Sequence, residues 1–264
     1  MRQSAKTEIG DLEVPINVRL KLRQSLGNRS NEKQQSNQRT EFVSENDKDL
    51  SKNYDRAAWF YEKSAKFYST NQIRASKRFQ LKYIEAGDKV LYLGAGTGED
   101  AVMASRAGAE VTCIDISQGM LDQVQRKLDK EDLKADLICQ NAFDHQRVGY
   151  YDVVASNYFL NVFRRDDMVK MLNFTATLVS PGGKYLVADV ARSQGNLLSQ
   201  AFNIFYLKLG MISYWLIGLV PLHENYDYCK FFPAAGLETE HVEFFRFAKK
   251  GPVLFQSIVA KKVD

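Results

Sequence analysis

The sequence has few of the residues that bind metals or form disulfide frameworks, with only three cysteines and three histidines among 264 residues. The cysteines are Cys113, Cys139 and Cys229, an odd number at wide spacing. Zinc sites need closely spaced ligand pairs, and disulfide-stabilised secreted domains have paired cysteines. We therefore expect reduced, buried thiols and no bound metal.

The sequence also lacks an excess of charge of one sign, since 36 Lys and Arg are balanced by 32 Asp and Glu, a net charge of +4. Proteins that bind single-stranded nucleic acid combine dense basic surfaces with stacking aromatic residues, and no stretch of this chain does so. The N-terminus lacks the apolar core of a secretory signal. These absences argue against nucleic acid as a partner and favour a cytoplasmic location.

Aromatic residues are almost missing from residues 1–53, where Phe42 is the only one. Residues 24–52 are rich in Asn, Gln, Ser and mixed charge, a composition that buries too little apolar surface to offset the entropy of ordering. Apolar positions within residues 1–23 allow a short docking element or an organelle-targeting remnant as alternatives, although Glu8, Asp11 and Glu13 argue against a transit peptide. We expect a flexible polar tail over residues 1–53 and a folded domain over residues 54–264.

Within the domain, apolar runs of strand length alternate with segments of helical periodicity, the pattern of a parallel sheet covered on both faces. Strands are predicted over 89–93, 110–115, 135–139, 151–156, 184–189, 241–247 and 253–261, and helices over 54–86 (two), 101–107, 119–128 and 168–178. The link between the last two strands is too short for a crossover, so these strands should be antiparallel. The predicted fold is α/β, with a doubly wound, seven-stranded, mostly parallel sheet that ends in an antiparallel hairpin.

A glycine-rich loop follows the first predicted strand, in the sequence VLYLGAGTG at residues 90–98. Glycines at this point allow close approach of the backbone to a ligand and direct the N–H groups of the following helix toward it. Asp115 ends the next strand, where a carboxylate can accept hydrogen bonds from ribose hydroxyls. Nicotinamide fingerprints read G-x-G-x-x-G, whereas residue 99 is Glu. The motif predicts a nucleoside-containing ligand.

Five motifs in order give the chain a resemblance to the class I S-adenosylmethionine (SAM)-dependent methyltransferases, which have a Rossmann-like fold. They are the glycine loop, VTCIDIS at 111–117, CQNAFD at 139–144, YDVVASN at 151–157 and LVSPGGKYLVAD at 178–189. The start of the domain, YDRAAWFY at 54–61, is also similar to the lead helix of members that act on small molecules and lipids, in which this helix covers the cofactor.

The resemblance implies S-adenosyl-L-methionine as the cofactor. It assigns the methionine part to the glycine loop, the ribose to Asp115 and the adenine to residues 116, 141 and 142. The implied cofactor-binding set is Tyr54, Tyr61, Tyr92, Gly94, Ala95, Gly96, Gly98, Asp115, Ile116, Met120, Asn141, Ala142 and Asn157. For Asn157 and also Asn161, a substrate contact and a structural capping role are both open.

The chain departs from the family pattern at two positions. Tyr92 replaces the acidic residue that usually stands two positions before the first glycine, and Asn141 replaces a frequent Asp. Either Asp115 and backbone groups suffice, with Tyr92 packed beside the cofactor, or SAM is bound unusually or serves another reaction.

Methyl transfer from a sulfonium is an in-line displacement that needs proximity and alignment, and needs a base only when the acceptor must lose a proton. Among residues 221–228 we name His223, Glu224 and Tyr226 as candidate catalytic residues, with an ordinary helix start as the alternative. His145 is expected at the solvated surface, and His241 is expected to be structural.

Residues 197–222 are unusually apolar, with Lys208 as their only charge. The segment fits a buried helix pair, a lid or interfacial surface for a hydrophobic acceptor, or insertion into a membrane. The expected function is SAM-dependent methyl transfer to a small hydrophobic acceptor, such as a quinone-like ring or a lipid amine, with peripheral membrane contact through this segment. The alternatives are transfer of a group other than methyl, or a SAM-binding module without catalysis.

Overall fold

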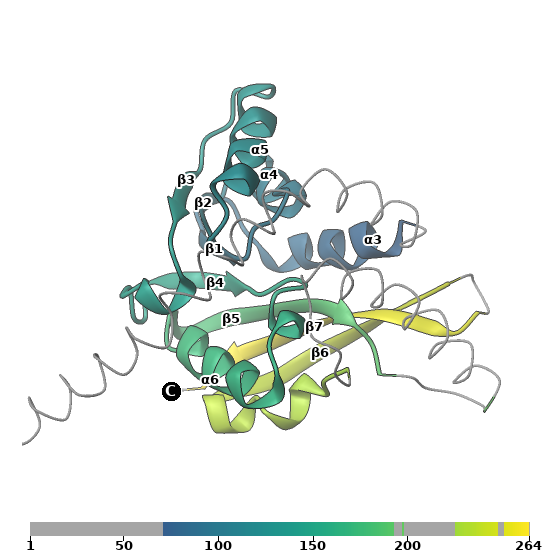
Figure 1. Ribbon diagram of the computed structural model, residues 1–264. Coiled ribbons are helices and arrows are strands. Elements are labelled where there is room, and N and C mark those ends of the chain that lie inside the picture. Colours follow the sequence, from purple (N-terminus) through teal and green to yellow (C-terminus); the bar gives the residue numbers. More distant parts are fainter. Residues whose placement is uncertain (1–70, 193–196, 198–224, 248–250, 264) are drawn as a thin grey trace, which may run out of the picture. The chain divides into compact units, whose positions relative to one another are not determined.

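Seven strands form one sheet in the order β3-β2-β1-β4-β5-β7-β6 (Figure 1). The computed structural model describes residues 71–192, 197, 225–247 and 251–263, all within the unit of residues 49–264. The strands are β1 Lys89–Leu93, β2 Glu110–Asp115, β3 Asp136–Cys139, β4 Tyr151–Ala155, β5 Val179–Val190, β6 Leu237–Arg246 and β7 Val253–Lys262. Strands β1 to β5 pair in parallel, and β7 is antiparallel to both β5 and β6. The predicted fold is confirmed.

Helices cover both faces of this sheet. The α-helices described are α3 Gln72–Phe79, α4 Glu99–Arg106, α5 Gln118–Asp129 and α6 Arg165–Ala176. The 3-10 helices described are η1 Gln80–Tyr83, η2 Ala142–Asp144, η3 Leu160–Val162, η4 Tyr228–Lys230 and η5 Pro233–Ala235. In Figure 1, α3, α4 and α5 lie on one side of the sheet, and α6 lies on the other.

The apolar strands are buried on both sides because successive side chains of a strand point to opposite faces. In β1, Val90 and Tyr92 pack in a cluster with residues of α4 and α5. Leu91 and Leu93 pack in a second cluster with residues of α6, η4 and η5. This double burial explains why β1 reads as a continuous apolar run.

The start of α5 illustrates how the local sequence fixes a helix. Ser117 is the N-cap, and its Oγ accepts a hydrogen bond from the Met120 N–H at 3.1 Å. Such a cap satisfies one of the N–H groups that a helix start leaves unpaired. Leu121, Val124 and Leu128 then recur at helical spacing and are buried against the sheet.

Several predicted bounds differ from the observed ones: β6 begins at Leu237 rather than at residue 241, α6 begins at Arg165 rather than at residue 168, and the start of the domain and β5 differ as well. Of the two helices expected over 54–86, only the part from residue 71 onward is described, and there the chain forms α3 followed by η1. β5 extends over residues 179–190 rather than 184–189, because it also pairs before its Pro-Gly-Gly sequence. The pairing of β4 with β5 shifts register between Tyr151 and Val153, so an irregularity absorbs residues that read as a turn.

The expectation of buried thiols was wrong for two of the three cysteines. Cys113 is buried in β2, but Cys139 is exposed and Cys229 is only partly buried; all three are free thiols. Cys139 ends β3, which is an edge strand with a neighbour on one side only.

The expectation that His145 is solvated was also wrong. Its side chain is buried, with Nε2 2.7 Å from the Tyr151 hydroxyl and Nδ1 3.1 Å from the Gln140 amide nitrogen. The loop after η2 folds back against the first residue of β4, which the sequence pattern does not reveal. Burial, together with the nearby positive charge of Arg147, lowers the pKa of His145.

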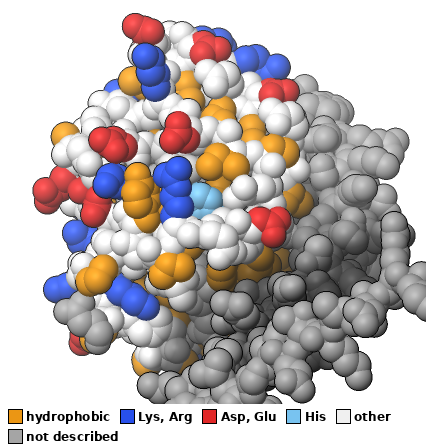
Figure 2. Space-filling view, turned by 90° about the vertical axis from the view of Figure 1, so that its left-hand side faces the viewer, with side chains coloured by type: hydrophobic (Ala, Val, Ile, Leu, Met, Phe, Trp, Pro, Cys, Tyr) orange, Lys and Arg blue, Asp and Glu red, His pale blue; other side chains and the backbone are white. Residues whose placement is uncertain are grey.

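Charge is mixed on the face drawn in Figure 2, where described Lys and Arg side chains lie among Asp and Glu with hydrophobic atoms between them. Within the ranges described, no helix combines the length and apolarity required to cross a membrane. The polar segment 1–53 and, apart from the exposed Leu197, the apolar segment 197–222 lie outside the described residues.

Candidate functional site: a glycine loop at the carboxyl edge of the sheet

The loop between β1 and α4 has three glycines in the left-handed region, with φ of 60° at Gly94, 51° at Gly96 and 67° at Gly98. The Gly94 N–H donates to the Ile114 carbonyl oxygen at 2.8 Å, which ties the loop to the end of β2. Gly98 is the N-cap of α4, so the first N–H groups of this helix lie at the end of the loop.

Two of these glycines are also required by packing. A Cβ atom at Gly98 would lie 2.5 Å from Val124 Cγ2 of α5, and one at Gly94 would overlap the ring of Phe159. At Gly96 the closest atom to an added Cβ would be the Gly94 carbonyl oxygen at 3.9 Å. The loop is therefore packed against the protein at its ends and open at its centre, which suits the close approach of a ligand.

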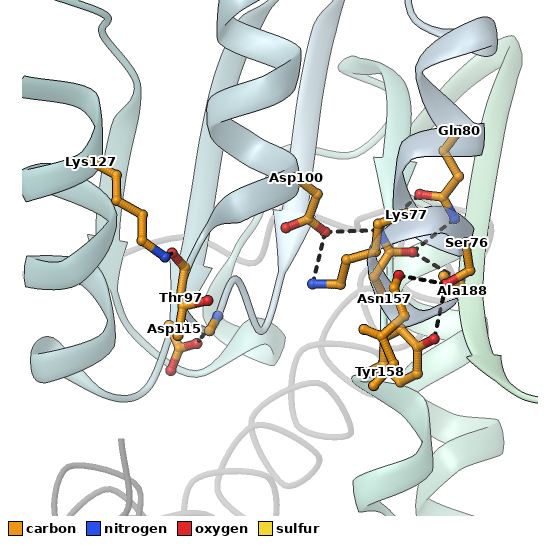
Figure 3. Close-up of polar contacts among 12 residues, drawn as sticks. Ser76, Lys77, Gln80, Thr97, Asp100, Asp115, Lys127, Asn157, Tyr158 and Ala188 are labelled. Atoms are coloured by element: carbon orange, nitrogen blue, oxygen red, sulfur yellow. Dashed lines mark hydrogen bonds and ion pairs between the residues drawn. The ribbon is translucent and has the colours of Figure 1, made fainter. Parts of the chain in front are cut away.

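Asp115 is the acidic residue that lies beside the loop, near Thr97 (Figure 3). Its Oδ2 accepts a hydrogen bond from the Gly96 N–H at 2.9 Å, and its Oδ1 accepts one from the Ser117 N–H at 2.9 Å. Lys127 of α5 donates to the Thr97 carbonyl oxygen at 2.8 Å, which fixes the loop from the other side. These bonds hold the Asp115 carboxylate beside the centre of the loop.

The predicted adenine segment lies next to Asp115. The Gln140 N–H donates to the Asp115 carbonyl oxygen at 3.1 Å, so the ends of β2 and β3 are joined. Asn141 is the N-cap of η2, and its Oδ1 accepts a hydrogen bond from the Phe143 N–H at 2.9 Å. The structure thus brings together the predicted set Gly94, Ala95, Gly96, Gly98, Asp115, Ile116, Met120, Asn141 and Ala142 around the carboxyl ends of β1, β2 and β3.

Tyr92 points into the protein core rather than along the loop. It is buried with α4 residues. Burial raises the pKa of its phenol well above the usual value, and the nearby Asp100 and Cys113 raise it further. The residue that replaces the usual acid is therefore a neutral core phenol with Asp100 beside it.

Asn157, which follows β4, is the centre of a buried polar network (Figure 3). Its Oδ1 accepts hydrogen bonds from Gln80 Nε2 at 2.9 Å and from the Ala188 N–H at 2.8 Å. Its Nδ2 donates to Gln80 Oε1 at 2.8 Å and to Asp100 Oδ2 at 3.0 Å. Lys77 Nζ lies 3.3 Å from the same Asp100 oxygen. These contacts support the structural alternative for Asn157, because they link η1, α4 and β5.

A second polar cluster lies at the carboxyl end of β5. The buried Asp189 accepts hydrogen bonds from the Tyr228 hydroxyl at 2.5 Å and from Asn161 Nδ2 at 2.7 Å. Burial and the neighbouring Asp189 raise the pKa of Tyr228 well above its usual value. Tyr226 is buried beside it and donates to the Phe163 carbonyl oxygen at 2.9 Å. Of the candidate catalytic residues the structure therefore places Tyr226 only.

A cavity of about 470 Å³ opens near this cluster. It is lined by Arg192, Tyr226, Asp227, Cys229, Val242, Phe244 and Gln256. Four predicted site residues, Tyr54, Tyr61, His223 and Glu224, lie outside the described residues. In the part of the chain that the structure describes, no group of three or more His, Cys, Asp and Glu is arranged to hold a metal.

Sequence reasoning missed Asp100 and Asp189. Asp100 comes two residues after the last glycine of the loop, and Asp189 lies at the end of β5. An acidic residue directly after a glycine loop, and one at the carboxyl end of a buried strand, were signals that could have identified them.

Residues 90–183 match the family described as a methyltransferase domain. The chain is 26% identical over 166 residues to the ubiquinone/menaquinone biosynthesis C-methyltransferase UbiE of Methylococcus capsulatus, covering 59% of this chain and 65% of that protein. It is 28% identical over 123 residues to the ubiquinone biosynthesis O-methyltransferase of Coxiella burnetii, covering 43% and 50%. The chain thus spans just under two thirds of the first relative and half of the second.

A solved structure with the same fold is the 1,6-didemethyltoxoflavin-N1-methyltransferase of Burkholderia thailandensis with bound 1,6-didemethyltoxoflavin and S-adenosylhomocysteine. Its TM-score is 0.59 at 15% identity, with 85% of this chain and 90% of that chain covered. The fold, the loop and the family match identify residues 90–183 as a methyltransferase domain of the class I type. The cofactor of this domain type is S-adenosylmethionine, which the open Gly96 and the adjacent Asp115 fit.

Proposed function

We propose that this protein transfers a methyl group from SAM to a small hydrophobic acceptor with a quinone-like ring. The observation that carries the proposal is the Asp115 carboxylate, held by the N–H groups of Gly96 and Ser117 at the centre of the glycine loop. A carboxylate at the end of the second strand is positioned to accept hydrogen bonds from ribose hydroxyls. The relatives' names, both from ubiquinone biosynthesis, support the acceptor class.

The cavity at the β5 end supports an acceptor that is partly apolar. Its lining combines Val242 and Phe244 with polar groups such as Gln256 and Arg192. Small-molecule sites have apolar walls with a few polar groups that fix orientation, and here Val242, Phe244 and the Tyr226 ring supply the apolar part beside the charged Arg192 and Asp227. Its volume of about 470 Å³ is within the usual range for such sites.

The chemistry asked of the chain is mainly positioning. SAM supplies an electrophilic methyl group on a sulfonium, and alignment with the acceptor can contribute much of the rate. Burial raises the pKa of the Tyr226 phenol, so this residue is protonated near neutral pH and already donates to the Phe163 carbonyl oxygen. We infer that Tyr226 shapes the acceptor side rather than removing a proton. His223 and Glu224 stay as candidate bases.

The test begins with calorimetric titration of the full chain with SAM and S-adenosylhomocysteine. If the protein binds these ligands, it is then incubated with methyl-labelled SAM and either a quinone-ring acceptor or a lipid amine. Mass spectrometry identifies the product. Label on the quinone supports the proposal. Label on the lipid amine alone means that the acceptor is a lipid amine and not a quinone-like ring. A different added mass identifies transfer of another group, and binding without turnover identifies a binding module.

Asp115→Ala is the matched site variant, and Asp122→Ala is its control. Asp122 lies on α5 with its side chain exposed, so its replacement removes the same charge away from the loop. We expect Asp115→Ala to weaken SAM binding by about 10- to 100-fold, since it removes a charged hydrogen-bond acceptor. Equal affinities for both variants and the native chain would remove the ribose assignment.

A further inference from the structure

Asp100 has an unsatisfied carboxylate oxygen inside the protein. The residue is 4% exposed. Its Oδ2 contacts Lys77 Nζ at 3.3 Å and Asn157 Nδ2 at 3.0 Å. Its Oδ1 is buried and has no hydrogen-bond partner. A buried charged group with an unmade hydrogen bond is costly, so such an atom calls for a specific explanation.

The position of Asp100 places its Oδ1 atom near the glycine loop. Asp100 is the second residue of α4, directly after the glycine loop. In Figure 3 its carboxylate lies between Lys77 and Asn157 on one side and the part of the loop that carries Thr97 on the other. The oxygen drawn without a dashed line is on the loop side. In this view the free acceptor is on the side of the glycine loop, which is predicted to hold the methionine portion of the cofactor.

The electrostatics around β1 agree with this placement. Tyr92 stands where an acidic residue is usual, and it is a buried neutral phenol. Asp100 is close enough to Tyr92 to raise its pKa. The negative charge that position 92 lacks is therefore supplied nearby from the first turn of α4.

We propose that Asp100 binds the α-ammonium group of the methionine part of SAM through Oδ1, in place of an acidic residue at position 92. The inference rests on the proposed function in requiring that the glycine loop binds SAM. An ionised carboxylate oxygen is an acceptor only, and an ammonium group has three donors, so the two are chemically matched. Lys77 and Asn157 hold the other oxygen and so orient Oδ1.

The test compares two ligands that differ in the amino-acid part. S-Adenosylhomocysteine carries the α-ammonium group, whereas 5′-methylthioadenosine has the same nucleoside and sulfur without it. Calorimetry on the full chain measures both ligands with the native protein and with Asp100→Asn. We expect Asp100→Asn to weaken the binding of S-adenosylhomocysteine by about 10- to 100-fold and the binding of 5′-methylthioadenosine by less than about twofold. This difference is the one expected for the loss of a charged hydrogen bond.

Glu99→Gln is the matched control. Glu99 is the preceding residue in the same helical turn, and its side chain is 41% exposed and paired with Arg74. This variant removes one negative charge from the same helix end. Comparing it with Asp100→Asn therefore separates the direct contact of Asp100 from the general effect of that charge on the affinities for both ligands. We expect Glu99→Gln to leave the ratio of the two affinities unchanged. If Asp100→Asn does not fold, Asp100→Ser provides the second variant, since a hydroxyl can still accept from Asn157.

The outcomes separate this inference from the proposed function. If the Asp100 variant binds both ligands more weakly by the same factor, or binds both as tightly as the native protein, the role of Asp100 is overturned. The proposal that the protein binds SAM is not affected by either result. Selective loss of S-adenosylhomocysteine without any methyl transfer supports Asp100 and overturns the proposed activity. Failure of the native chain to bind either ligand overturns both.

Discussion

Gly98 shows most directly how the loop depends on single residues. Its φ is +67°, and an added Cβ would meet Val124 Cγ2 at 2.5 Å. We expect Gly98→Ala to lower the free energy of unfolding by ~1–2 kcal/mol for the left-handed backbone and by a further ~1–3 kcal/mol for overpacking. Gly149→Ala is the control, because Gly149 has φ of +62° and no atom within 4 Å of an added Cβ. Chemical denaturation giving equal losses for the two variants would contradict the packing argument.

His145 gives a residue-scale prediction for pH. Its folded pKa lies below the ordinary value of 6.5 because of burial and Arg147. As the pH falls, the unfolded chain therefore takes up this proton first, and stability is lost from about pH 6.5 downward. Protonation also turns Nδ1 into a donor facing the Gln140 amide nitrogen.

We expect His145→Gln to flatten the dependence of unfolding free energy on pH between about pH 7.5 and 5.5, because the variant has no titrating ring. Chemical denaturation of both proteins across this interval measures the slope. Parallel curves for the native chain and the variant would show that another group is responsible.

At the scale of single residues, sequence reasoning identified positions whose roles are set by local spacing. Gly94, Gly96 and Gly98 were identifiable because a strand, a glycine loop and a helix follow one another directly. Asp115 was identifiable because it ends the next strand. The place of Asp100 after the glycine loop was visible in the sequence, but its contacts with Lys77 and Asn157, which are distant in the chain and adjacent in the fold, were not.

The helical elements α3 and η1 are joined to the sheet by the amide pair Gln80–Asn157. The two side chains exchange hydrogen bonds of 2.8 and 2.9 Å, and both are buried. We expect Gln80→Ala and Asn157→Ala each to lower the free energy of unfolding by about 1–3 kcal/mol, since each leaves a buried amide without its hydrogen-bond partner. The double variant should cost less than the sum of the two by about 0.5–3 kcal/mol.

Chemical denaturation of the four proteins in this cycle measures the coupling. Gln118→Ala serves as a control, because its bond to Asp122 on α5 is exposed and should contribute little. Strict additivity of the Gln80 and Asn157 effects would mean that these amides stabilise the fold independently.

The elements were predictable where burial gives a clear apolar run, as in β1 and β2. The extent of β5 was not, because Pro181, Gly182 and Gly183 read as a turn, whereas β4 provides a partner strand on both sides of them. The burial of His145 likewise depends on Tyr151 of β4 rather than on its own neighbours. Tertiary pairing therefore decides the details that periodicity leaves open.

At the scale of the whole molecule, the relative direction of the strands followed from general rules of connection, whereas their order in the sheet comes from the structure. Short links between alternating strands and helices require right-handed crossovers and so parallel pairing, and the short final link requires a hairpin. In the observed order β1 and β3 flank β2 in parallel, so their carboxyl ends share one edge and Asp115 meets the glycine loop. Such rules cannot show which groups complete the acceptor side, because the cavity lining combines Tyr226 with residues of β6 and β7.

Because the site unites separate elements of one cooperative fold, ligand binding should stabilise the whole domain. A ligand at 100 times its Kd adds about 2.7 kcal/mol to the unfolding free energy. For a protein of this size, that corresponds to a rise in Tm of roughly 5–10 °C. We expect S-adenosylhomocysteine to raise Tm in proportion to the logarithm of its concentration above Kd, and Asp115→Ala to need 10- to 100-fold more ligand, about the factor for a lost charged hydrogen bond. Differential scanning calorimetry measures both curves. A Tm that stays constant across ligand concentrations at which titration shows saturation would mean that binding is not coupled to the global unfolding of the domain.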